Sequence, residues 1–251
     1  MSVQTAAPWH RAVLAQTKVE LTLTLRRGES LLLTLGIPVV LLVFFSVVDV
    51  LPLPDGVTDA VDFLAPGILA LAVMSTAMVS LGIATGFERQ YGVLKRLGTT
   101  PLGRRALLAA KTLSVLAVEV VQVAVLGAVA IALGWRPEGS VALAVVAAAL
   151  ATIAFAGLGL LMAGTLRGEV TLAAANGLYL VLLLLGGMVF PLERLPDALR
   201  SVAELLPAAA LSIALDGALS ASASVPSKAW AVLIVWAIAA PAVAARRFRW
   251  E

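Results

Sequence analysis

The chain has 251 residues, of which 61% are hydrophobic and 13% are charged, and its formal net charge at pH 7 is +3. Soluble domains average about 45–50% apolar and about 25% charged residues, so this composition excludes an ordinary soluble globular domain and predicts a membrane protein. The chain has no cysteine and a single histidine, His10, which excludes disulfides, cysteine-ligated zinc and a serine–histidine dyad within the membrane.

Residues 1–30 do not form a signal peptide pattern, because polar and charged side chains run through them without a compact apolar core. Between residues 9 and 27, leucines share one helical face and polar side chains share another: Leu14, Leu21 and Leu25 against Arg11, Lys18 and Thr22. This pattern predicts an amphipathic helix in the headgroup layer. A partly ordered cytoplasmic tail is the alternative.

Six apolar stretches follow, and the sequence therefore predicts an all-α polytopic protein with a six-helix transmembrane domain over residues 31–251. The predicted spans are residues 31–48, 63–86, 106–133, 140–166, 170–190 and 229–245. Small residues recur along the second span, among them Gly67, Gly82 and Gly86, and such residues let helices approach closely in lipid. Pro38 lies within the first span, where a kink is tolerated.

The segments between these spans are polar and rich in turn residues. Residues 49–62 form an acidic loop, and residues 87–105 form a strongly charged one. Residues 191–227 differ from the rest because prolines interrupt them, and their longest apolar piece, residues 205–215, is too short to span a bilayer. We expect re-entrant helices there, on the extracellular side before the last span.

Lysine and arginine are distributed unevenly between the two sides of the predicted bundle. One side carries the N-terminal segment, the 87–105 loop and the C-terminus with most of the basic residues, whereas the other carries only Arg136, Arg194, Arg200 and Lys228. The positive-inside rule predicts that both termini lie in the cytoplasm and that the protein resides in the cell membrane. Basic residues placed at helix ends by topology give no reason to expect a nucleic-acid partner.

The 87–105 loop contains a candidate helix over residues 88–97, in which Tyr91, Leu94 and Leu97 would share one face. Residues 98–101, Gly-Thr-Thr-Pro, end that helix. Lying parallel to the membrane, it would offer a rigid docking surface. A solvated basic loop that only sets topology is the alternative.

Two segments together resemble the membrane subunit of an ATP-binding-cassette (ABC) exporter of the type-2 permease family. They are ERQYGVLKRLGTTPLGRRALLAAK after the second span and GGMVFPLERLPDALRSVAELLPAAALSIAL after the fifth. The resemblance implies that the first holds a coupling helix seated on a nucleotide-binding subunit, with these coupling residues: Glu88, Arg89, Tyr91, Gly92, Leu94, Lys95, Leu97 and Pro101. It implies that the second holds outer re-entrant helices, marked by Gly187, Phe190, Pro191, Leu195 and Pro196.

The same resemblance places ATP hydrolysis on a separate protein, and this chain has no G-x-x-x-x-G-K-[ST] phosphate loop. We therefore expect a permease and not an enzyme, with no cofactor of its own and with ATP and Mg²⁺ held by the partner. The implied assembly contains two ATPase subunits and a second permease, identical or paralogous, within membrane lipid.

Four residues are candidates for a substrate pathway: Glu119, Gln122, Asn176 and Phe190. An ionisable group in a span is a functional hypothesis by default, although pairing with a neighbouring helix is the alternative for Glu119, and Asn176 can serve as interhelical glue. Aromatic residues make up only 6%, which favours export of an amphiphilic drug, antibiotic or lipid over a glycan. An ion-driven secondary transporter and a non-transport scaffold remain competing functions.

Overall fold

Long apolar runs form helices here because a helix satisfies its own backbone hydrogen bonds where no water is available. The computed structural model describes residues 8–26, 28–48, 59–100, 102–189 and 191–249, and every regular element in those ranges is helical. In chain order the elements are α1 (Trp9–Arg26), α2 (Gly28–Val47), α3 (Ala60–Met74), η1 (Ser75–Ser80), α4 (Leu81–Gln90), α5 (Val93–Gly98), α6 (Arg104–Ala132), α7 (Val141–Thr165), α8 (Gly168–Leu185), η2 (Leu192–Arg194), α9 (Asp197–Ala203), α10 (Pro207–Leu219) and α11 (Ser227–Arg247). The predicted all-α class is confirmed.

Five helices in the described residues are long and apolar enough to cross a membrane: Ala60–Gln90, which joins α3, η1 and α4, and α6, α7, α8 and α11. A sixth is reached if α9 and α10, bent by 84° at their junction, count as one broken span. The expected first span corresponds to α2, which has 20 residues, but its described apolar part, Thr34–Val47, is shorter than a full span. The predicted count of six therefore lies at the upper limit of what the structure supports.

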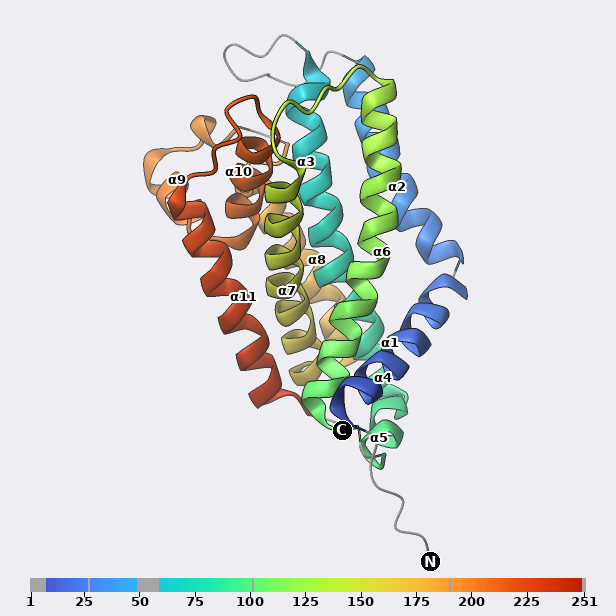
Figure 1. Cartoon of the computed structure of the whole chain (residues 1–251). Coiled ribbons are helices and arrows are strands. Elements are labelled where there is room, and N and C mark those ends of the chain that lie inside the picture. The colour runs from blue at the N-terminus through green and yellow to red at the C-terminus, as the bar shows by residue number, and fades with distance from the viewer. Residues whose placement is uncertain (1–7, 27, 49–58, 101, 190, 250–251) are drawn as a thin grey trace, which may run out of the picture.

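Figure 1 shows the long helices as one bundle with α3 near its middle, in keeping with the 72% burial of the Ala60–Gln90 span. α5 lies at one end of the bundle, where α1 begins and α11 finishes; we call this the α5 end. The bent pair α9 and α10 lies at the opposite end, which we call the α9 end. The two segments that carry the family resemblance are therefore separated by the whole length of the bundle.

Glycines allow the helices to pack closely, as the small residues of the predicted second span indicated. A Cβ on Gly82 would lie 3.2 Å from the backbone of Gly159 on α7, and one on Gly86 would lie 3.1 Å from the Thr171 side chain on α8. Gly67 meets the Met188 carbonyl in the same way. These glycines let α3 and α4 pack against three other parts of the chain without an intervening side chain.

Two boundaries differ from the predictions. The second span continues to Gln90 and contains a π-helical segment, η1, which apolar periodicity gave no means of anticipating. The fifth span was expected to reach residue 190, but α8 ends at Leu185, and Gly187 then adopts a φ of +69°. Glycine reaches this left-handed region without the penalty of a Cβ atom, so the chain turns at the Gly186–Gly187 pair.

The acidic loop predicted at residues 49–62 falls largely outside the described residues.

Candidate functional site

The α5 end is built around a sharp break in the chain at Gly92. α4 continues to Gln90, Gly92 has a φ of +74°, and only then does α5 begin at Val93. A left-handed glycine after the last helical residue is a common way to end a helix. The single helix predicted over residues 88–97 is therefore wrong, because Glu88 and Arg89 belong to α4.

α5 itself is six residues long and attaches to the bundle through one side. Leu94 is fully buried and Leu97 is half-buried, whereas Lys95 and Arg96 are exposed. Tyr91 does not share the buried face that was predicted for it: its side chain is 72% exposed, with its ring stacked on Phe87 at 6.1 Å between centroids. An aromatic ring and two cations are thus presented to the outside of the bundle.

The end of α5 is fixed by two hydroxyl groups. Thr99 Oγ1 donates to the Arg96 carbonyl at 2.7 Å, and Thr100 Oγ1 donates to the Leu97 carbonyl at 2.6 Å. Each carbonyl also accepts the backbone N–H of the same threonine, so the hydroxyl groups add a second hydrogen bond at the helix end. The predicted breaker sequence is confirmed as the end of the helix, although Pro101 lies outside the described residues.

Beside α5, a buried lysine joins three helices. The Nζ atom of Lys111, on α6, lies 2.9 Å from Glu20 Oε2 on α1 and 2.7 Å from Glu88 Oε2 on α4. The Lys111 side chain is 1% exposed, and the two glutamate side chains are 11% and 15% exposed. Gln16 donates a further hydrogen bond to Glu20 Oε1 at 2.8 Å. We call Lys111, Glu20 and Glu88 the Lys111 cluster.

The Lys111 cluster changes the interpretation of Glu88. A buried charge is tolerated only when it is paired and hydrogen-bonded. Removing one member of the cluster would leave unpaired buried charges, which would destabilise the fold. Glu88 was expected to act at the partner ATPase, but the structure directs its carboxylate to Lys111 within the same chain. The end of α4 is thereby joined to α1 and α6. The one signal for this cluster in the sequence is a lysine within a predicted span, because a charged group there usually pairs with other protein groups.

α1 packs on α6 next to this cluster. Val13 is buried against Ala106 and Ala110 of α6, whereas Leu14 and Leu25 are 63% and 55% exposed. The predicted helix is present, and these two leucines lie on the side that faces away from the protein. In a bilayer, that apolar side would face lipid.

At the α9 end, the second motif forms the turn into the broken helix pair. The Gly187 carbonyl accepts a hydrogen bond from Ser212 Oγ on α10 at 3.1 Å, and the Leu192 side chain packs against Gly187. Pro191 precedes η2 and Pro196 precedes α9, with Leu195 between them. The predicted break is confirmed there, and Phe190 lies outside the described residues.

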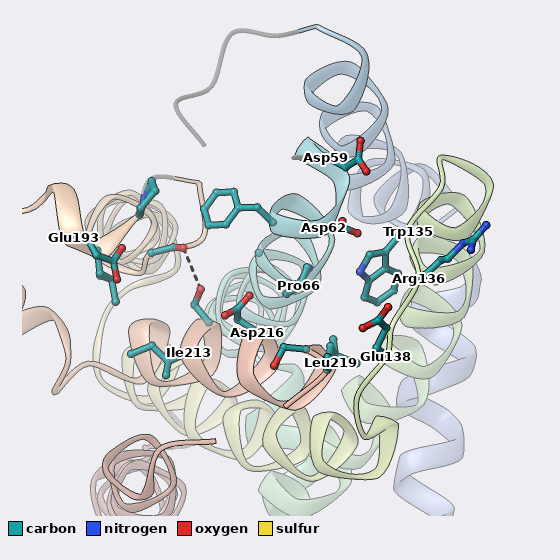
Figure 2. A pocket seen from close by; sticks show the side chains of 18 of the residues that line it. Asp59, Asp62, Pro66, Trp135, Arg136, Glu138, Glu193, Ile213, Asp216 and Leu219 are labelled. Carbon is teal, nitrogen blue, oxygen red and sulfur yellow. Dashed lines mark hydrogen bonds between the residues drawn. The ribbon is translucent and has the colours of Figure 1, made fainter. Parts of the chain in front are cut away.

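This turn borders a cavity of about 1130 Å³ at the α9 end, between α3, α10 and the α6–α7 connection. Its lining includes more acids than bases: Asp59, Asp62, Glu138, Glu193 and Asp216 against Arg136 and Arg194. Figure 2 shows Asp62, Glu138 and Asp216 around the same opening, with the Arg136 guanidinium pointing away from them. An acidic lining attracts cations and repels anions.

The comparisons with known proteins agree with this architecture. A family model described as "ABC-2 type transporter" matches residues 11–219. The chain belongs to the ABC-2 type transporter family. It is also 29% identical over 205 residues to a Bacillus subtilis (strain 168) protein named "Putative transport permease YvfS", across 76% of this chain and 79% of that relative.

Because this chain is an ABC-2 membrane permease, it lacks the ATPase domain of an ABC transporter, and permeases of this family generally pair with separate ABC ATPase subunits. Within the described residues there is no group of three or more histidine and acidic side chains that could hold a metal ion. The candidate functional residues of this ABC-2 permease lie at its two ends and among the polar groups of its spans.

Those polar groups make contacts between helices of the same chain. Gln122 on α6 accepts from Thr76 Oγ1 on η1 at 3.0 Å and donates to the Thr34 carbonyl on α2 at 2.8 Å. Glu119 on α6 is 4% exposed, and its Oε2 accepts from Thr152 Oγ1 on α7. Neither residue lines the acidic cavity at the α9 end. These contacts favour the packing interpretation of both residues, and a pathway role stays a prediction.

Asn176 lies on an exposed side of α8, and its amide donates to the Leu172 carbonyl one turn earlier at 2.9 Å. In the part of the chain that the structure describes, Asn176 makes no side-chain hydrogen bond to another helix, so it is not interhelical glue within this subunit. The structure does not bring Asn176 together with Glu119 and Gln122 into one site.

Proposed function

We propose that this ABC-2 permease is the membrane subunit of an exporter driven by a separate ATPase that docks on α5. The observation that carries the proposal is the α5 end itself. The short helix α5 presents exposed Lys95 and Arg96, and the turn before it presents exposed Tyr91. The preceding helix, α4, is tied to α1 and α6 through the Lys111 cluster.

This arrangement suits a mechanical connection. A ligand shifts a conformational equilibrium only through different affinities for the two states, and ATP would supply that difference on the partner. Displacement of α5 would reach α1 and α6 through Glu88 and Lys111, because buried ion pairs resist separation. Two ATPase subunits and two permease subunits, identical or paralogous, complete the proposed complex.

The charge distribution supports an orientation with the α5 end in the cytoplasm of a cell-membrane protein. The elements at that end carry Lys95, Arg96, Arg104, Arg105 and the arginines after residue 245, whereas the α9 end is largely acidic. Basic residues concentrate on the cytoplasmic side of membrane proteins. The acidic cavity at the α9 end would then open outward.

For the substrate, we propose an amphiphilic drug, antibiotic or lipid-like molecule. The chain has few aromatic residues for stacking on sugars, and the outer cavity is lined by carboxylates. Such a lining favours cationic or neutral amphiphiles over anionic ones during release. An ion-driven transporter is less well supported, because its broken helices would meet near the bilayer midplane, whereas α9 and α10 lie at one end of the bundle.

Purification with the native partner tests this function. In mild detergent, we expect the tagged chain to retain an ABC ATPase, and Gly92→Val to lower the retained amount about tenfold, because strained φ/ψ values cost about 1–3 kcal/mol and displace α5. Gly103→Ala is the matched control, since Gly103 lies in the same loop with an ordinary φ of −70° and open space around it. Absence of any ATPase, together with proton-driven uptake by the chain alone, would contradict the proposal.

A further inference from the structure

A second charged feature of the α5 end takes no part in the proposed coupling. A cavity of about 480 Å³ lies where three membrane helices end, and its lining consists of Arg104, Thr165, Arg246, Arg247, Phe248 and Arg249. Arg104 begins α6, Thr165 ends α7, and Arg246 and Arg247 lie in the last turn of α11. Arginines about 140 residues apart in the sequence thus surround one space; we call it the arginine cavity.

The residues that follow α11 are held against the end of α7, which fixes the position of Arg249 at the cavity. Phe248 is 1% exposed and packs against Gly164 near the end of α7, where a Cβ atom would lie 2.5 Å from Phe248 Cδ2. The Arg249 N–H donates to the Gly164 carbonyl at 3.1 Å. Arg249 is therefore positioned by an anchored backbone rather than by a free tail.

The arginines of this cavity have no acidic partner within the described residues. The ion pairs found there use Lys111, Arg200 and Lys228 as their cations. Arg89, at the end of α4, is a further arginine at the α5 end, and its Nη1 is buried without a hydrogen-bond partner in the described part of the chain. Several unpaired guanidinium groups around one cavity create a positive potential that attracts an anion.

The start of α6 adds to the attraction for an anion. Its N-cap residue is Gly103, which has no side chain to accept from the first-turn N–H groups. The N-terminus of a helix carries a partial positive charge and free N–H donors, both of which favour phosphate. Arg104, the first residue of the same helix, lines the cavity.

The position of the cavity favours lipid over a protein partner. Val235, Ile238 and Val243 on α11 are 61%, 66% and 42% exposed, so one side of this span faces the hydrocarbon. Arg246 and Arg247 follow within the next turn, at the level where headgroups begin. In Figure 1, α5 extends farther from the spans than the end of α11 does, so a docked protein on α5 need not reach this cavity.

We propose that the arginine cavity binds the phosphate group of an anionic phospholipid from the leaflet at the α5 end. Guanidinium groups pair with phosphate oxygens through two parallel hydrogen bonds, and basic pockets between membrane helices commonly hold lipid phosphates. The acyl chains would lie along the apolar side of α11. The site does not depend on the identity of the exported substrate, and only its assignment to the inner leaflet rests on the orientation proposed above.

Native mass spectrometry of the full-length chain in detergent tests this site by titration with phosphatidylglycerol or phosphatidylcholine. The variant Arg104→Gln/Arg246→Gln is expected to weaken phosphatidylglycerol binding about tenfold or more, because each basic residue near a lipid surface contributes roughly 1 kcal/mol. The control Arg96→Gln/Arg105→Gln removes the same charge from the same end without touching the cavity lining. It should change the affinity less than about twofold, and phosphatidylcholine binding should be unaffected throughout.

Three results would overturn the proposal. An equal loss in both double variants would show that only diffuse positive charge attracts the lipid. Complete displacement of phosphatidylglycerol by inorganic phosphate would identify a site for a soluble anion, because a lipid held also by its acyl chains resists that competition. Unchanged lipid affinity in the cavity variant, with loss of a co-purifying ATPase, would make the cavity a protein-docking surface instead.

Discussion

Replacing Lys111 with methionine is expected to lower the free energy of unfolding by about 3 kcal/mol and to uncouple the permease from its ATPase. The substitution leaves Glu20 and Glu88 facing each other, largely buried, without the cation that each contacts within 3 Å. Breaking a buried ion pair costs about 3–5 kcal/mol, and the lower limit applies because both carboxylates keep some solvent contact. The midpoint of thermal unfolding should fall by roughly 6–12 °C for a chain of this size.

Two further variants separate this effect from simple loss of charge. Lys95→Met removes an exposed cation from α5 and should leave the unfolding midpoint within about 2 °C, because exposed charges contribute little. Adding Glu20→Gln and Glu88→Gln to Lys111→Met removes the unpaired charges and should restore most of the stability without restoring coupled ATP turnover. Wild-type stability and turnover in Lys111→Met alone would show that the Lys111 cluster neither holds nor links these helices.

Replacing Gly159 with leucine is expected to prevent formation of the correctly packed bundle. A Cβ atom at this position would lie 2.6 Å from the Met78 carbonyl oxygen on η1, closer than a Cβ atom can approach, so α7 would have to move away from η1 and α4. Overpacking a core costs about 1–3 kcal/mol for added methylenes alone, and here backbone blocks the side chain from its first atom. We expect at least tenfold less monodisperse protein by size-exclusion chromatography in detergent.

Gly177→Leu is the matched control, because Gly177 lies within a membrane helix, α8, and a Cβ there meets nothing within 4 Å. That variant should yield monodisperse protein at close to the wild-type amount. Equal yields from both leucine variants would mean that the contact between α7 and η1 does not limit folding. Equal losses would mean that bulk in any span is harmful, which would remove the argument from the close approach at Gly159.

The main architecture follows from patterns that the amino-acid sequence displays directly. Long apolar runs predict helices because no other backbone arrangement within one segment satisfies its hydrogen bonds in lipid. The prolines around residues 191–207 predicted a broken segment, and the structure places the 84° bend between α9 and α10 there. Gly67, Gly82 and Gly86 predicted close helix contacts, which all three make.

Other features depend on how the helices are rotated and on where they break, which the sequence pattern does not specify. Lys111 joins Glu20 and Glu88 across 91 and 23 residues of chain, and no local spacing links the three. Placing Tyr91 beside Leu94 assumed an unbroken helix, whereas the left-handed Gly92 turns the two side chains in different directions. The arginine cavity likewise requires the start of α6 to lie near the end of α11, and only the tertiary packing determines that.

A single cysteine at position 95 gives the most direct test of the claim that α5 is a cytoplasmic docking element. The chain has no cysteine of its own, and Lys95 is exposed on α5, so Lys95→Cys creates one reactive thiol. Labelling with a membrane-impermeant maleimide is expected in inside-out vesicles and not in intact cells, with slower labelling when the ATPase is bound. Rapid labelling in intact cells, or a rate that the ATPase leaves unchanged, would contradict the account.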